Sequence, residues 1–180
     1  MTSFISQAYD SVSHVGATSD KWKGRPSMAF ELTSSAFKQN GAIPKEYSCD
    51  GSDISIPLSW NKPPEGTKSL AVIADDPDAP RGTWVHWVLY DIPAEVRELP
   101  EGIGPQESLQ DGTKQGRNDF GKVGYGGPCP PSGPAHHYYF KLYALDQLTG
   151  LKSKATKQQL LDAIKGHVLA ETQLIGTYKR

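Results

Sequence analysis

The sequence predicts a mainly β protein, an antiparallel two-sheet β-sandwich with one C-terminal helix packed at one end. Short apolar runs rich in β-branched and aromatic residues alternate with Gly/Pro turns, which is typical of strands. One late segment, at about 157–170, has helical periodicity instead. Many short strands followed by a single helix favour a sandwich over a parallel α/β fold.

Five segments have strand character. The clearest are residues 69–75, 84–92 and 136–145, which are dense in Val, Ile, Leu and aromatic side chains between turn residues. Residues 29–37 and 172–178 are shorter versions of the same pattern. Together they supply enough strands for two sheets.

The predicted helix has a recognisable start and one apolar face. Thr156 and Gln159 have the spacing of a capping box, in which each side chain bonds the other residue's backbone N–H. Leu160, Ile164 and Val168 then recur every four residues, which places them on one side of a helix.

The length of 180 residues favours a single domain, which we place at residues 28–180. Residues 1–27 are rich in Ser, Thr and Asp without periodicity, and we expect a loose extension there. Residues 93–134 form a long Gly/Pro-rich region. So long a connection is usually functional, and we expect it to contain a short strand or two.

Composition excludes several function classes. The 19 basic and 20 acidic residues balance, so no basic surface for nucleic acid is expected. No apolar run reaches the roughly 20 residues that span a bilayer, and the first residues lack a signal-peptide pattern. We therefore expect a cytoplasmic protein. Cys49 and Cys129 are predicted to be free thiols rather than a pair.

Strand parity gives candidate site residues on the second strong strand. Because side chains alternate between faces, His86 is expected to share a face with Trp84, Val88 and Tyr90. A lone buried histidine is often only structural, so His86 by itself does not indicate a site.

The last strong strand begins with two histidines that parity separates. His136 shares a face with Tyr138, Phe140 and Leu142, which is the more apolar and so the inner side. His137 points the other way. We therefore expect His136 at the inner end of the strand and His137 outside.

The stretch "ADDPDAPRG" (74–82) adds carboxylates directly after an apolar strand. Its prolines restrict the backbone and hold these side chains in place. Two histidines and an aspartate match a mononuclear metal site, but no short ligand spacing supports one, so no metal or cofactor is expected. An anion site fits better, because glycine-rich turns and imidazoles both offer hydrogen bonds to anions.

Catalysis is a further alternative. His86 and Asp76 would serve as acid and base on a phosphate ester. The nucleophile elbow G-x-S-x-G is absent from the sequence. A non-enzymatic binding protein is therefore preferred, with no catalytic residue assigned.

Four ordered motifs resemble the phosphatidylethanolamine-binding proteins, also called Raf kinase inhibitor proteins, in their short bacterial and archaeal form. They are "DPDAP", "WVHWVLYDIP", "GYGGPCPP" and "HHYYFKLYALD", and the resemblance extends over about 28–180. It implies a β-sandwich with a small cavity for phosphate-like anions and phospholipid head groups. By position the cavity would use Asp76, Asp78, His86, Gly126, Gly127, Pro128, His136 and Tyr138.

The sequence departs from the family pattern at two places. "PCPPSGP" looks inserted, which makes the backbone donors of that loop uncertain, and His137 stands where many relatives have Arg. The expected ligand is a phosphorylated small molecule, head group or side chain. The resemblance also permits an inhibitor of serine proteases or kinases, for which the region at about 100–120 is the candidate loop. The sequence also leaves two alternatives for the tryptophans: they are exposed and form the interface of a homodimer, or they pack in the core.

Overall fold

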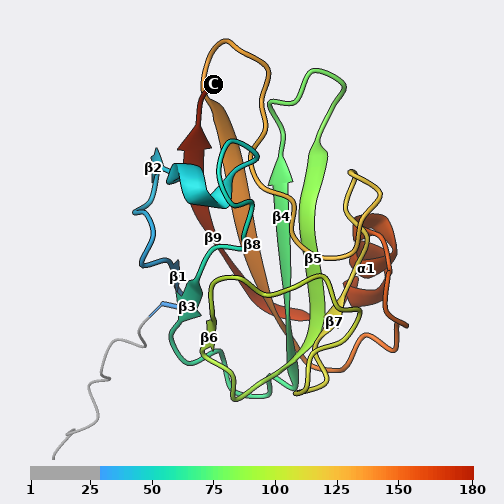
Figure 1. Cartoon of the computed structure of the whole chain (residues 1–180). Helices are drawn as coiled ribbons and strands as arrows, with labels where there is room; N and C mark the ends of the chain where they lie inside the picture. Colours follow the sequence, from blue (N-terminus) through green and yellow to red (C-terminus); the bar gives the residue numbers. More distant parts are fainter. Residues whose placement is uncertain (1–28) are drawn as a thin grey trace, which may run out of the picture.

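The structure is a computed structural model that describes residues 29–180, so the predicted extension at 1–27 lies outside the described residues. The described chain forms two β-sheets and a short α-helix (Figure 1), which confirms the predicted mainly β fold. The elements are β1 (Leu32–Thr33), β2 (Gly41–Ala42), the 3₁₀ helix η1 (Lys45–Tyr47), β3 (Leu58–Trp60), β4 (Ser69–Asp76), β5 (Trp84–Pro93), β6 (Glu98–Leu99), β7 (Lys114–Gln115), β8 (His136–Leu145), α1 (Lys157–Ile164) and β9 (Val168–Tyr178).

The larger sheet has the order β2-β9-β8-β4-β5-β7, and the smaller has the order β1-β3-β6. Neighbouring strands run antiparallel except for the short β2–β9 pair, which is parallel. The three strong predicted strands, β4, β5 and β8, lie side by side at the centre of the larger sheet. The expected strand at 29–37 is reduced to Leu32–Thr33.

Strand β4 is buried along its whole length because both faces of the sheet are covered. Leu70 and Val72 point to the inner core, which also contains side chains of the smaller sheet. Ala71 and Ile73 point to a second core beneath helix α1. The sheet is therefore the middle layer of the protein.

Helix α1 has the predicted capping box, with Thr156 and Gln159 bonding each other's backbone amides. It ends at Ile164, however, so the predicted end at 170 is wrong. Gly166 has φ +82°, a left-handed conformation that favours glycine and commonly terminates helices. Val168 then begins β9 and pairs with Leu145. The helix lies against the outer face of the larger sheet (Figure 1).

Asp75 fixes that helix to the sheet. Its side chain is 1% exposed and accepts hydrogen bonds from Lys141 on β8, at 3.2 Å, and from Lys157 in the first turn of α1. Two ammonium groups compensate the desolvation of this buried carboxylate. Asp75 therefore has a structural role on the face opposite to Asp76.

Strand β5 contains two β-bulges that sequence alternation does not reveal. Trp87 pairs with Ala74 and Val85 with Asp75, so His86 is an extra residue without a Cα partner on β4. The second irregularity lies at Asp91, which has φ +56°. An extra residue bends the strand and shifts the alternation of its side chains by one.

Because of the first bulge, the predicted alternation of side chains along β5 is wrong beyond His86. His86 and Trp84 line one cavity, as expected, but Val88 and Tyr90 lie in the outer core beneath α1. Trp87 joins the inner core instead. Two consecutive side chains, His86 and Trp87, therefore lie on the inner side of the sheet.

The Gly/Pro-rich region at 93–134 contains β6 and β7, in agreement with the expected short strands. Its residue Cys129 forms a disulfide with Cys49, 80 residues earlier, so the prediction of free thiols is wrong. Two cysteines so far apart carry no pairing signal in the sequence. Without free thiols, the cysteines give no support for a reducing compartment. In the described part of the chain, no helix has the length and apolarity to cross a membrane.

Candidate functional site

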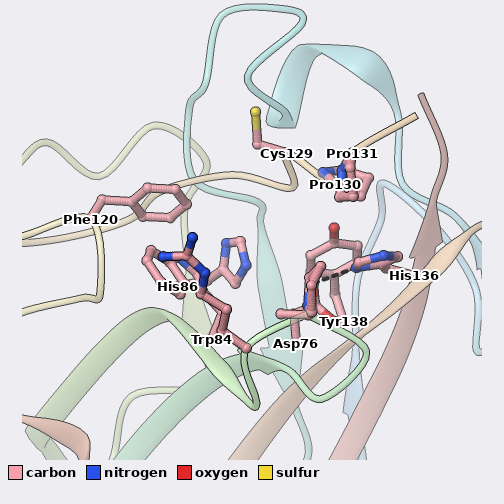
Figure 2. Close-up of a pocket in the computed structure, with 12 residues that line it drawn as sticks. Asp76, Trp84, His86, Phe120, Cys129, Pro130, Pro131, His136 and Tyr138 are labelled. Atoms are coloured by element: carbon pink, nitrogen blue, oxygen red, sulfur yellow. Dashed lines mark hydrogen bonds and ion pairs between the residues drawn. The ribbon is translucent and has the colours of Figure 1, made fainter. Parts of the chain in front are cut away.

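A cavity of about 300 Å³ lies where β4, β5 and β8 meet the Gly/Pro-rich loop (Figure 2). We call it the main cavity. This volume is at the lower end of the range for small-molecule sites, roughly 300–1,000 Å³. The cavity is lined by Asp76, Ala79, Pro80, Arg81, Trp84, His86, Phe120, Cys129, Pro130, Pro131, His136 and Tyr138.

Asp76 at the end of β4 positions His136 at the start of β8. Asp76 Oδ2 lies 2.8 Å from His136 Nδ1, and both side chains are at least nine-tenths buried (Figure 2). Asp76 Oδ1 accepts a hydrogen bond from the backbone N–H of Asp78 at 2.8 Å, so both carboxylate oxygens are occupied. Because the carboxylate accepts from Nδ1, the neutral form of His136 has its proton there.

His86 is held by Gly126 at two points. The backbone N–H of Gly126 donates to the backbone oxygen of His86 at 3.0 Å. The imidazole Nδ1 lies 2.6 Å from the Gly126 carbonyl oxygen, which only accepts, so Nδ1 carries a proton. Burial lowers the pKa of His86, although its hydrogen bond to Gly126 and the charge of Asp76 oppose this effect.

Aromatic rings pack around the His86 imidazole. Tyr138 and Phe120 each meet it edge to face, with ring centroids 5.2 and 5.3 Å away. Phe120 also meets Trp84 at 5.5 Å. These contacts restrict the rotation of the imidazole and keep water from its sides. His86 is only 4% exposed as a result.

Two buried polar atoms of the cavity lining form no hydrogen bond within residues 29–180. They are the Tyr138 hydroxyl and the Trp84 indole N–H. Buried polar groups are normally paired, so each unpaired group needs an explanation such as a ligand or water. Burial raises the pKa of Tyr138, and the nearby backbone N–H of Cys129, which acts on the phenol oxygen, lowers it only in part, so the hydroxyl stays protonated and its proton is available for donation.

Asp78 and His137 lie outside the main cavity. His137 is on the exposed side of β8, as parity predicts, and both its backbone N–H and Nδ1 bond Asp78 Oδ2 at 2.9 and 2.7 Å. About half of each of these side chains is exposed. Asp78 therefore braces the rim and does not reach the cavity.

None of the three predicted loop residues Gly126, Gly127 and Pro128 lines the main cavity, and two of them border a different space. Gly126 and Gly127 line a neighbouring cavity of about 260 Å³, the side cavity, which shares Phe120 and Cys129 with the main one. The N–H of Gly127 donates to Asp53 Oδ1 at 2.7 Å, that of Gly126 is used by His86, and Pro128 has none. These residues therefore offer the main cavity no free backbone donor.

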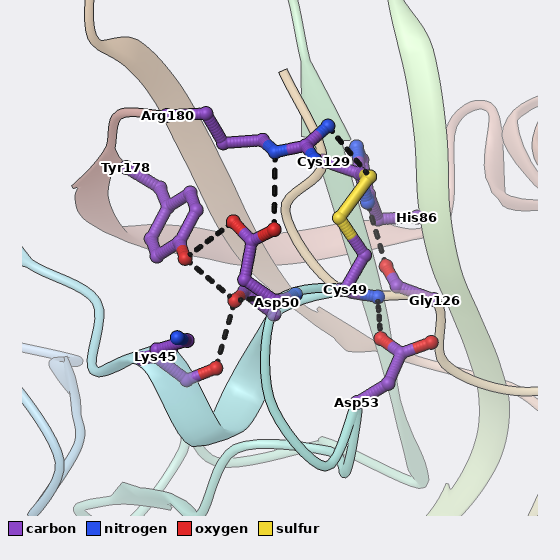
Figure 3. The surroundings of a disulfide bond; sticks show 11 residues. Lys45, Cys49, Asp50, Asp53, His86, Gly126, Cys129, Tyr178 and Arg180 are labelled. Carbon is purple, nitrogen blue, oxygen red and sulfur yellow. Dashed lines mark hydrogen bonds and ion pairs between the residues drawn. A yellow bond between two sulfur atoms is a disulfide. The ribbon is translucent and has the colours of Figure 1, made fainter. Parts of the chain in front are cut away.

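The disulfide fastens this loop to the segment after η1 (Figure 3). The backbone N–H of Cys49 also donates to the Pro128 carbonyl at 3.1 Å. Arg180 at the C-terminus bonds Asp50 at 3.1 Å across the same region. Since Cys129 and the prolines that follow it line the main cavity, these contacts fix one cavity wall.

Sequence reasoning missed Arg81 and Phe120. Arg81 directly follows the quoted proline turn, so its position beside Asp76 and Asp78 was a usable signal. Phe120 comes from a turn between Asn118 and Gly124, and nothing in the sequence marks it as part of the site. Among the described residues, no group of three or more His, Cys, Asp or Glu side chains is arranged to hold a metal ion.

Comparison with known proteins gives a consistent result. A family model described as phosphatidylethanolamine-binding protein matches residues 33–179. The UPF0098 protein of Methanothermobacter thermautotrophicus is 51% identical over 149 residues, which cover 83% of this chain and 98% of that protein. The name of that protein states no ligand.

Two solved structures have the same fold. A phosphatidylethanolamine-binding protein homologue of Chlamydia trachomatis is 43% identical, with a TM-score of 0.77, over 84% of this chain and 98% of that one. YbcL of Escherichia coli, described as a member of the mammalian family, is 36% identical, with a TM-score of 0.78 over the same shares. The chain therefore belongs to the phosphatidylethanolamine-binding protein family.

Proposed function

We propose that the main cavity binds a phosphate-like anion, carried by a phosphorylated small molecule, a phospholipid head group or a phosphorylated side chain, without converting it. The observation that carries this proposal is the buried Tyr138 hydroxyl, which has no partner in the described chain. An oxyanion would accept from this hydroxyl and from the Trp84 indole N–H. The family name, which refers to a phospholipid, supports the same ligand class.

Charge and shape around the cavity also support an anion with an apolar attachment. Arg81 supplies a guanidinium at the lining, and guanidinium groups match phosphate oxygens in geometry. Pro80, Phe120 and Pro131 form apolar walls that suit the carbon part of a phosphorylated molecule. The charge of Asp76 is directed to His136 and not to the ligand.

Calorimetric titration with inorganic phosphate and phosphorylethanolamine tests the proposal, with Tyr138→Phe and Tyr139→Phe as a matched pair. The two tyrosines are neighbours on opposite faces of β8, and only Tyr138 lines the cavity. Losing a hydrogen bond to a charged group costs on the order of 1.5–3 kcal/mol. Tyr138→Phe should therefore weaken binding by about tenfold or more, whereas Tyr139→Phe should not change it.

Absence of one-site binding at millimolar phosphate, or equal affinity of wild type and Tyr138→Phe, would overturn the proposal. Phosphorylethanolamine should be recovered unchanged after the titration. Release of inorganic phosphate from it would favour the hydrolase alternative instead.

A second candidate, inhibition of a serine protease, is favoured by one observation. The Gln115 side chain, 0% exposed, donates to the carbonyls of Gly104 and Gln106, each at 2.7 Å. These bonds brace the exposed Pro105 between them, and a braced exposed loop is what a rigid inhibitor presents to a protease. The wild-type protein should inhibit members of a panel of chymotrypsin- and elastase-like proteases. The Gln115→Ala variant lacks the two bonds that hold the loop, so these proteases should cleave it as a substrate. No inhibition across that panel would exclude this candidate.

A further inference from the structure

The polar groups of the main cavity include an acceptor as well as donors. His86 Nδ1 carries the proton because it faces the Gly126 carbonyl at 2.6 Å. In the neutral imidazole, Nε2 then has a lone pair and only accepts. His86 lines the cavity, and the hydrogen bond that its ring forms with the described residues uses Nδ1, so Nε2 is the polar atom left to a ligand. A ligand that satisfies it must bring its own hydrogen-bond donor.

The surroundings of His86 favour this neutral form. The ring lies between Phe120 and Tyr138, which provide no charge. Burial, the largest effect, lowers its pKa. The charged or titratable groups around it are Asp75 and Asp76 from β4, His136 and Tyr138 from β8, and Arg81 from the turn before β5. Both carboxylates have partners: Asp76 is hydrogen-bonded to His136 and to the Asp78 amide, and Asp75 is hydrogen-bonded to Lys141 and Lys157 on the other face of the sheet.

We propose that the main cavity selects a tetrahedral oxyanion that retains an O–H, as protonated phosphate does, and discriminates against sulfate. In this arrangement the O–H donates to His86 Nε2, while the unprotonated oxygens accept from Tyr138, Trp84 and Arg81. Inorganic phosphate keeps at least one O–H at neutral pH, whereas sulfate has none. Sulfate would set an oxygen lone pair against the lone pair of Nε2 and leave both unpaired.

This selection distinguishes the sources of the phosphate. A phosphomonoester loses its last acidic proton near pH 6. A phosphodiester, such as an intact phospholipid head group, has no acidic O–H at any neutral pH. Among the sources named in the proposed function, the site should therefore prefer inorganic phosphate, or a free monoester head group such as phosphorylethanolamine in its singly protonated state, to the diester of an intact phospholipid. This inference rests on the proposed function, since it names which phosphate species the proposed site takes.

The test compares inorganic phosphate, arsenate, sulfate, methyl phosphate and dimethyl phosphate by calorimetry on the full-length protein at pH 5.5 and 7.5. Arsenate has the same protonation as phosphate, so both should bind at least about tenfold tighter than sulfate or dimethyl phosphate at pH 7.5. Sites built to bond an O–H reject analogues that lack it. Methyl phosphate should bind tighter at pH 5.5 than at pH 7.5.

Two variants separate the acceptor from the donors. His86→Phe removes the acceptor and keeps a ring, so phosphate affinity should fall until the phosphate-to-sulfate ratio is close to one. Tyr138→Phe removes a donor that serves either anion, so it should weaken both and leave the ratio unchanged. If His86→Phe does not fold, ¹⁵N labelling of the wild-type histidines replaces it. Phosphate should then shift the Nε2 signal of His86, and sulfate should not.

The outcomes distinguish the two proposals. Equal affinity for phosphate and sulfate, or methyl phosphate binding that strengthens from pH 5.5 to 7.5, overturns the selection and leaves anion binding intact. A Nε2 signal that does not respond to bound phosphate also overturns it. Failure of all five anions to bind overturns the proposed function itself.

Discussion

Asp76 and His136 form a buried pair, with 2.8 Å between Oδ2 and Nδ1 and side-chain exposures of 5% and 10%. Two residues after Asp76, Asp78 makes the same kind of bond to His137, at 2.7 Å, but with exposures of 42% and 49%. Adjacent histidines at the start of β8 thus pair with two aspartates, Asp76 at the end of β4 and Asp78 in the turn that follows. One pair is buried, and the other is about half exposed.

The two pairs provide an internal comparison of buried and exposed hydrogen bonds. His136→Ala leaves the buried Asp76 carboxylate without a main partner and should lower the free energy of unfolding by about 3 kcal/mol or more. His137→Ala removes a solvent-exposed bond and should cost at most about 1 kcal/mol. Urea denaturation at pH 7 measures both values, and a cycle with Asp76→Asn isolates the coupling between Asp76 and His136. Equal losses for the two histidine variants would contradict this account.

The disulfide between Cys49 and Cys129 should stabilise the fold substantially. Cross-linking residues separated by 80 positions restricts the unfolded chain, and a loop of that length is worth about 4.5 kcal/mol in the chain-entropy model. The double variant Cys49→Ser, Cys129→Ser should unfold at clearly lower urea concentration than the oxidised wild type. A dithiol reductant should lower the wild-type midpoint to nearly that of the variant and should not affect the variant. An unchanged wild-type midpoint after complete reduction, verified by thiol titration, would contradict the prediction.

Gly127 has no room for a side chain. A Cβ atom there would lie 2.2 Å from the Tyr47 carbonyl oxygen and 2.6 Å from Asp53 Oδ1. Gly127→Ala should therefore separate the Gly/Pro-rich loop from the segment after η1 and cost about 2 kcal/mol or more. Ser132→Ala, at an exposed position of the same loop, should stay within about 0.5 kcal/mol of wild type. Thermal unfolding measures the melting temperatures of the two variants. Equal values would mean that the loop is not held at Gly127.

Stability should depend on pH through His86. Its folded-state pKa is lowered by burial, so between that pKa and the ordinary value near 6.5 the unfolded chain binds a proton that the folded protein excludes. Above the ordinary pKa, His86 is neutral in both the folded and the unfolded chain, so it does not change the free energy of unfolding there. As the pH falls through it, the free energy of unfolding should decrease by at most about 1.4 kcal/mol per pH unit.

The measurement is a series of urea titrations between pH 8 and pH 5 on wild type and His86→Phe. All other ionisable groups are the same in both proteins, so the difference between the two curves isolates His86. That difference should be flat above pH 7 and should change in favour of the variant as the pH falls. A difference that stays constant down to pH 5 would show that His86 is not held in its neutral form.

How much of this structure follows from sequence depends on how local the signal is. The strand at 136–145 and the separation of His136 from His137 follow from period-two alternation alone. The capping box at Thr156 is likewise a local pattern that predicts its own geometry. The helix end was misjudged because Val168 continues the apolar spacing. Gly166, which terminates the helix, was the stronger signal.

The rest depends on contacts between distant residues. The pairing of Cys49 with Cys129 and the arrival of Phe120 at His86 are set by tertiary structure, and the sequence carries no spacing that predicts them. Hydrogen bonding within the loop is equally non-local. Glycines suggested free backbone donors, whereas Gly126 and Gly127 use their N–H groups on His86 and Asp53.

The bulge in β5 has a consequence for how the strand would tolerate deletion. Without His86 the strand would read Trp84, Val85, Trp87, Val88, and inner and outer side chains would alternate regularly. A one-residue deletion would thus leave a more regular strand with its core residues in place and no imidazole in the cavity. The bulge thus adds an imidazole to the cavity lining while the core residues on either side of it keep their alternation.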